Sequence, residues 1–225
     1  EDEVFGHGVS YVQEEPAWGG RNDTAAELRG ICGLAHAHFR RQDALDVLAA
    51  LLADPERTAR VAAAHGLGDA GRTEASALLR FKLLHGDAEP QVLSACCESL
   101  LALQPEGGLS FLVRFIDSYD DRAEVAVLAL GSSRMVTAVP HLERWCDSCR
   151  PEQRGRVAYL ALALSRTDAG TKRLLEVIRS GRGPDAIAAA RALATFKDDP
   201  SIRRQILDAA HAQRDAIRDV IEDLM

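Results

Sequence analysis

Six apolar stretches of similar sequence recur at intervals of about 32 residues, and this period constrains the fold more than any other feature. Each stretch carries an Ala-Leu-like pair. The leucines taken as equivalent are Leu34, Leu67, Leu100, Leu130, Leu164 and Leu193. They are spaced by 33, 33, 30, 34 and 29 residues. A period of this length predicts a row of similar structural units, each packed on its neighbours.

A second kind of apolar run lies between these stretches and completes each unit. Its five members keep large apolar residues at positions i, i+3, i+4 and i+7, which is the helical period. They cover residues 44–54, 74–84, 108–117, 138–147 and 171–180. No run shows the strict alternation of a half-buried strand. The sequence therefore predicts an all-α chain in which a helix–turn–helix unit occurs six to seven times.

Composition limits the compartment and the class of partner. The formal net charge is −7, which argues against a nucleic-acid binder because such proteins need a basic face. The five cysteines are an odd number, and Cys96 is adjacent to Cys97, so a disulfide framework is not expected. No apolar segment reaches the roughly 18 residues that span a bilayer, and no signal peptide is visible. We expect a cytoplasmic protein that binds no membrane.

The best-formed unit, residues 44–71, resembles the HEAT-repeat superfamily in its short bacterial form, which is also found in phycobilin lyase-like proteins. The family pattern is a first helix, Asp-Pro at the turn, then Val-Arg-x-x-Ala-Ala-x-Ala-Leu-Gly-x-Leu-Gly. Arg60, Ala63, Ala64, Leu67, Gly68 and Gly71 match this pattern, while Ala59 stands for the Val, Gly66 for the third Ala and Ala70 for the second Leu. The resemblance covers roughly residues 24–210.

The resemblance implies a right-handed α–α superhelix, that is, a HEAT-like solenoid. It predicts an irregular segment or remnant cap at residues 1–23 and a repeat domain at 24–225. Within that domain, residues 200–225 are expected to form the C-terminal cap, since a terminal layer needs a polar outer face. In the family, Asp54 and Arg60 belong to a ladder across successive turns, so we expect them to be structural.

The sequence GLGDAG at residues 66–71 has the spacing of a dinucleotide-binding fingerprint. That fingerprint needs a strand before its first glycine and a helix after its third. The preceding ARVAAAH is helical in its pattern, so a pyrophosphate site is not expected. We interpret the glycines as the end of the second helix of this unit.

The sequence WCDSC at residues 145–149 resembles the Trp-Cys-x-x-Cys of thioredoxin-like oxidoreductases. Cys146 falls at the end of a predicted helix, where the helix dipole raises the pKa of a thiol. A zinc site at His141, Cys146 and Cys149 would lack a fourth ligand. Since no hydrolase, phosphate-loop or metalloprotease motif is present, we expect no catalytic residue, no cofactor and no metal site.

In HEAT solenoids the second helices line the concave face, and that face commonly binds. Positions two and five before each equivalent leucine are expected to point away from the core. The candidate protein-binding residues are His65, Glu98, Val125, Leu128, Tyr159, Leu162 and Arg191. Four of these are large and apolar or aromatic where water is expected, which indicates a protein contact.

The predicted function is a non-catalytic scaffold or regulatory module that binds a protein or peptide on its concave face. Two alternatives stay open. A bilin lyase-like or chaperone subunit follows from the resemblance, although no residue can be assigned that chemistry. A DNA-binding HEAT-like protein is the other, and the acidic composition opposes it. The sequence leaves the oligomeric state open.

Overall fold

The computed structural model describes residues 10–14, 21–118 and 120–225. The chain divides into two compact units, Glu1–Ser110 (unit 1) and Phe111–Met225 (unit 2). Within the described ranges, no helix is long and apolar enough to cross a membrane.

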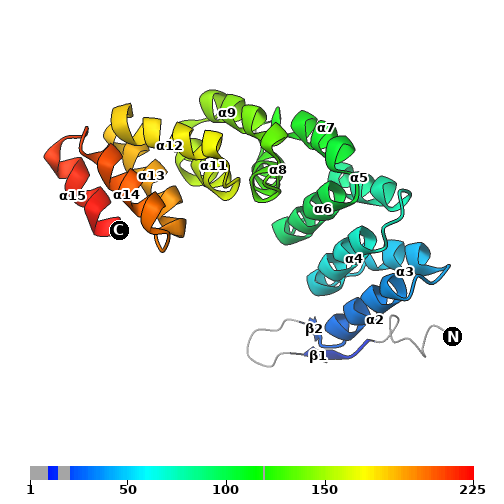
Figure 1. The fold of residues 1–225 in the computed structure, drawn as a ribbon. Helices are drawn as coiled ribbons and strands as arrows, with labels where there is room; N and C mark the ends of the chain where they lie inside the picture. The colour runs from blue at the N-terminus through cyan, green and yellow to red at the C-terminus, as the bar shows by residue number, and fades with distance from the viewer. Residues whose placement is uncertain (1–9, 15–20, 119) are drawn as a thin grey trace. The chain divides into compact units, whose positions relative to one another are not determined.

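Unit 1 begins with a short two-stranded antiparallel sheet, followed by helices (Figure 1). Its elements are β1 (Val12–Glu14), β2 (Arg21–Asp23), α2 (Ala26–His38), α3 (Ala44–Leu51), α4 (Arg57–Asp69), α5 (Ala75–His85) and α6 (Pro90–Leu103). The boundary between the units falls inside α7 (Pro105–Ile116). The helices α3 and α5 coincide with the runs predicted from the helical period, and α4 and α6 carry the recurring apolar stretches with Leu67 and Leu100.

Every described secondary-structure element of unit 2 is a helix. Its elements after α7 are α8 (Asp121–Ser132), the 3₁₀ helix η1 (Val136–Ala138), α9 (Val139–Ser148), α10 (Pro151–Gln153), the π-helical η2 (Arg154–Ala158), α11 (Tyr159–Leu164), α12 (Asp168–Ser180), α13 (Gly183–Leu193), the 3₁₀ helix η3 (Ala194–Phe196), α14 (Pro200–Ala210) and α15 (Asp215–Leu224). Helices α6, α10, α13 and α14 carry proline in their first two positions, where its missing N–H costs no hydrogen bond.

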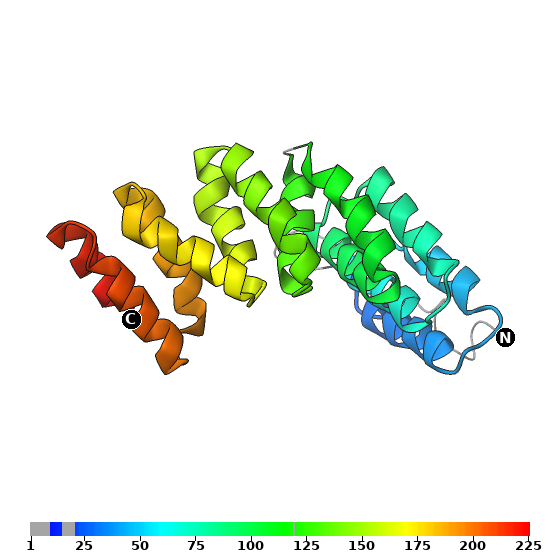
Figure 2. The same cartoon turned by 45° about the horizontal axis from the view of Figure 1, so that its top comes forward.

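Helix pairs stack in sequence order within each unit. In unit 1, α2, α4 and α6 contact one another in turn, while α3 and α5 pack beside them. In unit 2, α8, α11, α13 and α15 contact in turn, and α9, α12 and α14 form the accompanying row. The turned view in Figure 2 shows the yellow, orange and red helices of unit 2 in consecutive layers. The all-α, helix-pair architecture predicted from the sequence is confirmed.

Small residues let the second helices of neighbouring layers approach closely. Gly68 of α4 faces Ser99 of α6, and a Cβ atom built at Gly68 would lie 2.9 Å from the Ser99 Cβ. Gly131 of α8 faces the backbone of Ala161 in α11 in the same manner. The core between these contacts is built from leucine and alanine, for example the fully buried Leu67, Leu100 and Leu130. Alanine thus both favours helix formation and allows the layers to pack closely.

The predicted alignment is wrong in one layer, that of α11. Leu164 is half-buried, whereas Leu162 is fully buried. Gly68 directly follows the equivalent Leu67 and faces Ser99, the residue just before the equivalent Leu100. Gly131 directly follows the equivalent Leu130 and faces Ala161, so the equivalent leucine of α11 is the one after Ala161. Left-handed backbone occurs four residues after Leu67 and Leu130, at Gly71 and Arg134, and also at Arg166, four residues after Leu162. The π-helical segment Arg154–Ala158 changes the phase of this helix relative to a regular α-helix.

The GLGDAG motif begins inside a helix. Gly66 and Gly68 lie in α4, and a Cβ at Gly66 would meet the side chain of Leu48 at 2.7 Å. Only Gly71, at φ +65°, takes the left-handed conformation that ends the helix and favours glycine. The interpretation as a helix end therefore applies to Gly71, while the first two glycines permit close packing.

The short sheet of unit 1 is organised by one buried carboxylate. Asp23 accepts hydrogen bonds from the Tyr11 backbone N–H at 2.7 Å and from the Ser10 hydroxyl at 2.7 Å. It also pairs with Arg29 of α2. Burial opposes ionisation of Asp23, but these hydrogen bonds outweigh it and hold its pKa well below the ordinary value. Parts of the predicted N-terminal segment, residues 1–9 and 15–20, lie outside the described residues, and its role as a cap stays a prediction.

Candidate functional site

The predicted ladder residues Asp54 and Arg60 connect consecutive layers of unit 1. Asp54 accepts two hydrogen bonds from Arg29, at 2.7 and 2.9 Å. Arg60 donates to the Asp54 backbone carbonyl and reaches Asp87 of the next layer with two bonds, at 2.9 and 3.0 Å. The repeated arrangement is a planar guanidinium facing a carboxylate from a neighbouring turn.

Asp87 shows the electrostatic character of this ladder. Its side chain is 4% exposed, and Lys82 approaches it at 2.8 Å in addition to Arg60. Burial raises the pKa of Asp87, but hydrogen bonds from Arg60 and Lys82 exceed that effect and lower the pKa to about 2. All the charges in this cluster are satisfied by one another, so the ladder offers a ligand little.

The two cysteines of WCDSC are buried at the end of α9. The Cys149 thiol donates to the Cys146 carbonyl, and that carbonyl also accepts a bond from Arg154. Burial, with the nearby Cys149 and Asp147, raises the pKa of Cys146 to about 12, and burial raises that of Cys149 as well. A redox dithiol needs the opposite shift. In the described parts of the chain, no group of three or more His, Cys, Asp and Glu side chains could hold a metal ion.

We expect a thiol reagent at neutral pH to label Cys32 first. Cys32 is half-buried, whereas Cys96, Cys97, Cys146 and Cys149 are buried and the pKa of each is raised. Buried thiols with raised pKa values hold almost no reactive thiolate. Mass spectrometry of digested, briefly labelled protein gives the order of labelling, and urea-unfolded protein is the control. Fast and selective labelling of Cys146 would contradict this interpretation and favour redox chemistry.

The predicted binding row is exposed in unit 1. His65 of α4 and Glu98 of α6 both reach solvent. Glu98 accepts a hydrogen bond from the Ser94 hydroxyl one turn earlier, at 2.9 Å. Alanine residues flank both positions: Ala62 is half-buried and Ala95 buried. This part of the row is polar and has little apolar surface.

In unit 2 the structure places the row differently from the sequence prediction. Val125 and Leu128 of α8 are half-buried and Arg191 of α13 is exposed, but Tyr159 is only 2% exposed and Leu162 is fully buried. The assignment of Tyr159 and Leu162 to a binding surface is therefore wrong, because the equivalent leucine of α11 is Leu162. Two residues before it stands Leu160, which is half-buried.

Leu160 and Arg191 line one groove of about 770 Å³ in unit 2. We call it the α11–α13 groove. Besides these two residues its lining comprises Pro151, Glu152, Gly155, Arg156, Arg182, Pro184, Asp185, Ala188, Ala192 and Thr195. Its size falls in the range of ligand-binding clefts. Apolar side chains of α11 and α13 thus lie beside three guanidinium groups.

Hydrogen bonds beneath the lining fix part of this groove. The buried Tyr159 donates its phenolic O–H to Asp185 at 3.1 Å. Burial, together with the neighbouring Asp185 charge, raises the pKa of Tyr159, so the phenol stays protonated. Glu124 of α8 pairs with Arg156 and accepts a bond from Gln153 at 3.1 Å. The sequence prediction missed this role of Tyr159, which is to hold a lining residue from below.

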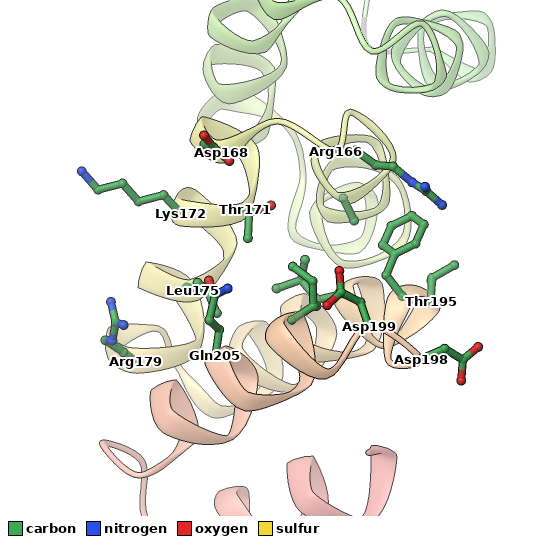
Figure 3. Close-up of a pocket in the computed structure, with 14 residues that line it drawn as sticks. Arg166, Asp168, Thr171, Lys172, Leu175, Arg179, Thr195, Asp198, Asp199 and Gln205 are labelled. Carbon is green, nitrogen blue, oxygen red and sulfur yellow. The ribbon is translucent and has the colours of Figure 1, made fainter.

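A second groove of about 770 Å³ in unit 2 lies between α12 and α14. Figure 3 shows ten labelled residues around it, with Lys172 and Arg179 on α12 and Asp199 at the start of α14. Arg166 packs over the Phe196 ring at 4.3 Å, and Asp199 caps α14 by accepting from the Ser201 N–H. Its lining carries three basic and three acidic side chains (Arg166, Lys172, Arg179, Asp168, Asp198, Asp199). Because basic and acidic side chains are equal in number, this lining favours neither an anionic nor a cationic ligand.

A third groove, of about 690 Å³, lies over α3 and α5 in unit 1. Phe81 and His85 line it with stacked rings 5.9 Å apart, and Phe81 is largely exposed. The charged residues of its lining include Arg60, Lys82 and Asp87, which already pair with one another. No sequence pattern singled out this groove.

Of the groove residues that the sequence prediction missed, Leu160 had a detectable signal. The spacings of 34 and 29 residues on either side of Leu164 depart from the mean of 32, whereas Leu162 gives 32 and 31. The alternating YLALALS at 159–165 offers a leucine at each alternative phase, so composition could not decide. Arg156 and Arg182 had no such signal, because their positions depend on the π-helical segment and on the start of α13.

Likeness to known proteins is found among solved structures and not among sequences. No family model and no curated protein matches the sequence. Among solved structures, the chain is similar to one from the complex of CpcE and CpcF of phycocyanin lyase from Nostoc sp. PCC7120. The identity is 18%, the match covers 96% of this chain and 100% of that chain, and the TM-score is 0.44.

Proposed function

We propose that this protein is a non-catalytic binding module that holds a protein or peptide segment against the second helices of unit 2. The α11–α13 groove carries this proposal. It lies on the helix row for which binding was predicted, and it combines half-buried Leu160 with exposed Arg191. Recognition sites usually combine an apolar surface with a small number of precisely positioned charged groups.

The neighbouring layer extends the same surface. Val125 and Leu128 of α8 are half-buried, and α8 contacts α11 directly. We therefore expect apolar side chains to continue from one layer to the next along the row. A solvent-facing row of this kind is typical of surfaces that bind a protein.

The proposal is tested by placing a photo-crosslinking amino acid at Leu160 in the full chain. We expect irradiation in an extract of the native host to give a discrete adduct from this position. The same amino acid at Val136, an exposed apolar residue of unit 2 outside the groove, is the matched control. In affinity capture, Leu160→Asp is expected to reduce the recovered partner at least about tenfold, since it places a carboxylate on the apolar floor.

Capture with Val136→Asp should remain at the level of the wild-type protein. Circular dichroism of both variants establishes that each is folded. Equal adducts from Leu160 and Val136, or equal losses in the two aspartate variants, would contradict binding in the groove. Tyr159→Asp is unsuitable because Tyr159 is buried.

The two alternatives from the sequence have direct tests of their own. A bilin lyase-like subunit would change the absorbance of an added tetrapyrrole in a manner that Leu160→Asp abolishes. A DNA-binding protein would give a gel shift that weakens with salt. Either result would replace the present proposal with a different ligand class.

A further inference from the structure

We infer that the segment bound in the α11–α13 groove is acidic, with its carboxylates on Arg182 and Arg191 and an aliphatic side chain on Leu160. This inference rests on the proposed function and names the chemistry of its partner. It is carried by the charges around the groove, by the contacts those charges already make, and by the apolar residues in the same lining.

Arg182 and Arg191 are exposed cations without an acidic partner among the described residues. Arg182 is the residue before α13 and makes no side-chain capping bond, while Arg191 lies near the end of the same helix. A guanidinium donates two parallel hydrogen bonds to a carboxylate, which gives such a pair both strength and direction. Both side chains are therefore available to a ligand.

Arg156 adds a third positive charge to the lining. It is paired with Glu124, yet its own side chain is 68% exposed, whereas that of Glu124 is 11% exposed. Glu124 thus anchors the guanidinium from below and leaves donors on its outer side, because a guanidinium has five N–H groups. This arrangement holds the charge in place before a ligand arrives.

Of the two acidic residues of the lining, Asp185 is less available to a ligand than the arginines. Asp185 accepts the Tyr159 hydroxyl and lies in the first turn of α13, where the helix dipole stabilises a carboxylate. Glu152 lies in the first turn of α10. With Arg156 paired to Glu124 and Asp185 bonded to Tyr159, the charges that still face a ligand are Arg182, Arg191 and the exposed Glu152. Two cations against one carboxylate favour an anion, although the whole chain has a net charge of −7.

The apolar floor distinguishes a peptide from a bare anion or a nucleic acid. Leu160, Ala188, Ala192 and Pro184 line the space beside the arginines. An aliphatic side chain of a peptide removes such a surface from water, whereas a free carboxylate or phosphate leaves it hydrated. The chain's overall negative charge opposes a continuous phosphate backbone more than a short segment with a few carboxylates.

The test uses the full chain and a fluorescent peptide of alternating glutamate and leucine, with glutamine–leucine and lysine–leucine peptides as controls. Fluorescence anisotropy is expected to show binding of the glutamate peptide alone. Combining Arg182→Glu with Arg191→Glu should weaken it by about a hundredfold, since two charge-assisted contacts are lost. The same double variant should gain binding of the lysine peptide.

Arg203→Glu combined with Arg204→Glu is the matched control, because both arginines are exposed on α14 and lie outside the groove lining. Its affinity for the glutamate peptide should equal that of the wild-type protein. Equal binding of the glutamine peptide, or an equal loss in this control variant, would overturn the inference. So would a labelled oligonucleotide that binds with the same dependence on Arg182 and Arg191 while the glutamate peptide does not.

The two proposals fail in different ways. If the crosslink at Leu160 forms and the groove arginines have no effect on partner or peptide binding, the acidic ligand class is wrong and the groove remains a binding site. If Leu160 gives no specific adduct and the glutamate peptide does not bind, both are wrong.

Discussion

Trp145→Ala is expected to destabilise unit 2 by about 3–5 kcal/mol, the cost of removing a large buried aromatic side chain. Trp145 is 1% exposed, and its indole N–H donates to the Ile116 carbonyl at 3.0 Å. The substitution leaves a cavity between α9 and the end of α7 and removes the partner of a buried carbonyl. Urea unfolding followed by circular dichroism measures the loss.

Val136→Ala is the matched control for this substitution, because Val136 lies in the same unit and is 71% exposed. Its effect is expected within about 0.5 kcal/mol of zero. Trp145→Phe should lie between the two, since it keeps an aromatic ring and loses the hydrogen bond. A Trp145→Ala loss no larger than that of Val136→Ala would show that α9 is not packed as described.

Gly131→Ala is expected to destabilise unit 2 by about 3 kcal/mol, against the direction of helix propensity. Alanine in place of glycine inside a helix ordinarily adds about 1 kcal/mol of stability. Here, however, a Cβ would lie 2.8 Å from the Ala161 Cα and closer still to the Ala161 carbonyl oxygen. Backbone atoms of a packed helix cannot yield as a flexible side chain can, so α8 and α11 must separate.

Gly155→Ala tests the same change where there is space. A Cβ at Gly155 would meet the Ala188 Cβ at 3.5 Å, an ordinary van der Waals contact in the same unit. We expect little change in the midpoint of thermal unfolding for Gly155→Ala and a clear fall for Gly131→Ala. Equal midpoints for the two variants would contradict the close layer contact at Gly131.

The helices could be predicted from the sequence because each depends on local pattern. The apolar period, proline at helix starts and the repeat length act within about 32 residues, and the structure has a helix at each expected place. The short sheet of β1 and β2 was not predicted. Its strands are three residues long, and their position depends on Asp23, whose partners include Arg29 of α2 and the backbone of Tyr11.

The candidate site was only partly predictable. Arg191 and the half-buried Val125 and Leu128 follow from counting along regular helices. Tyr159 and Leu162 do not, because the π-helical segment before α11 changes which side of that helix is buried. A shift of one or two residues in a helix moves a side chain from solvent into the core.

The sequence by itself determined the repeating helix pair, since periodicity and helix propensity are local properties of the chain. The tertiary structure decided which residues of that pair remain available to a partner. It buried Tyr159 beneath Asp185, exposed Arg182 and Arg191, and placed Leu160 in the same groove. These outcomes depend on contacts between helices about 30 residues apart in the sequence. At one such contact Gly131 faces the backbone of Ala161, and this close approach fixes how α8 and α11 pack on each other.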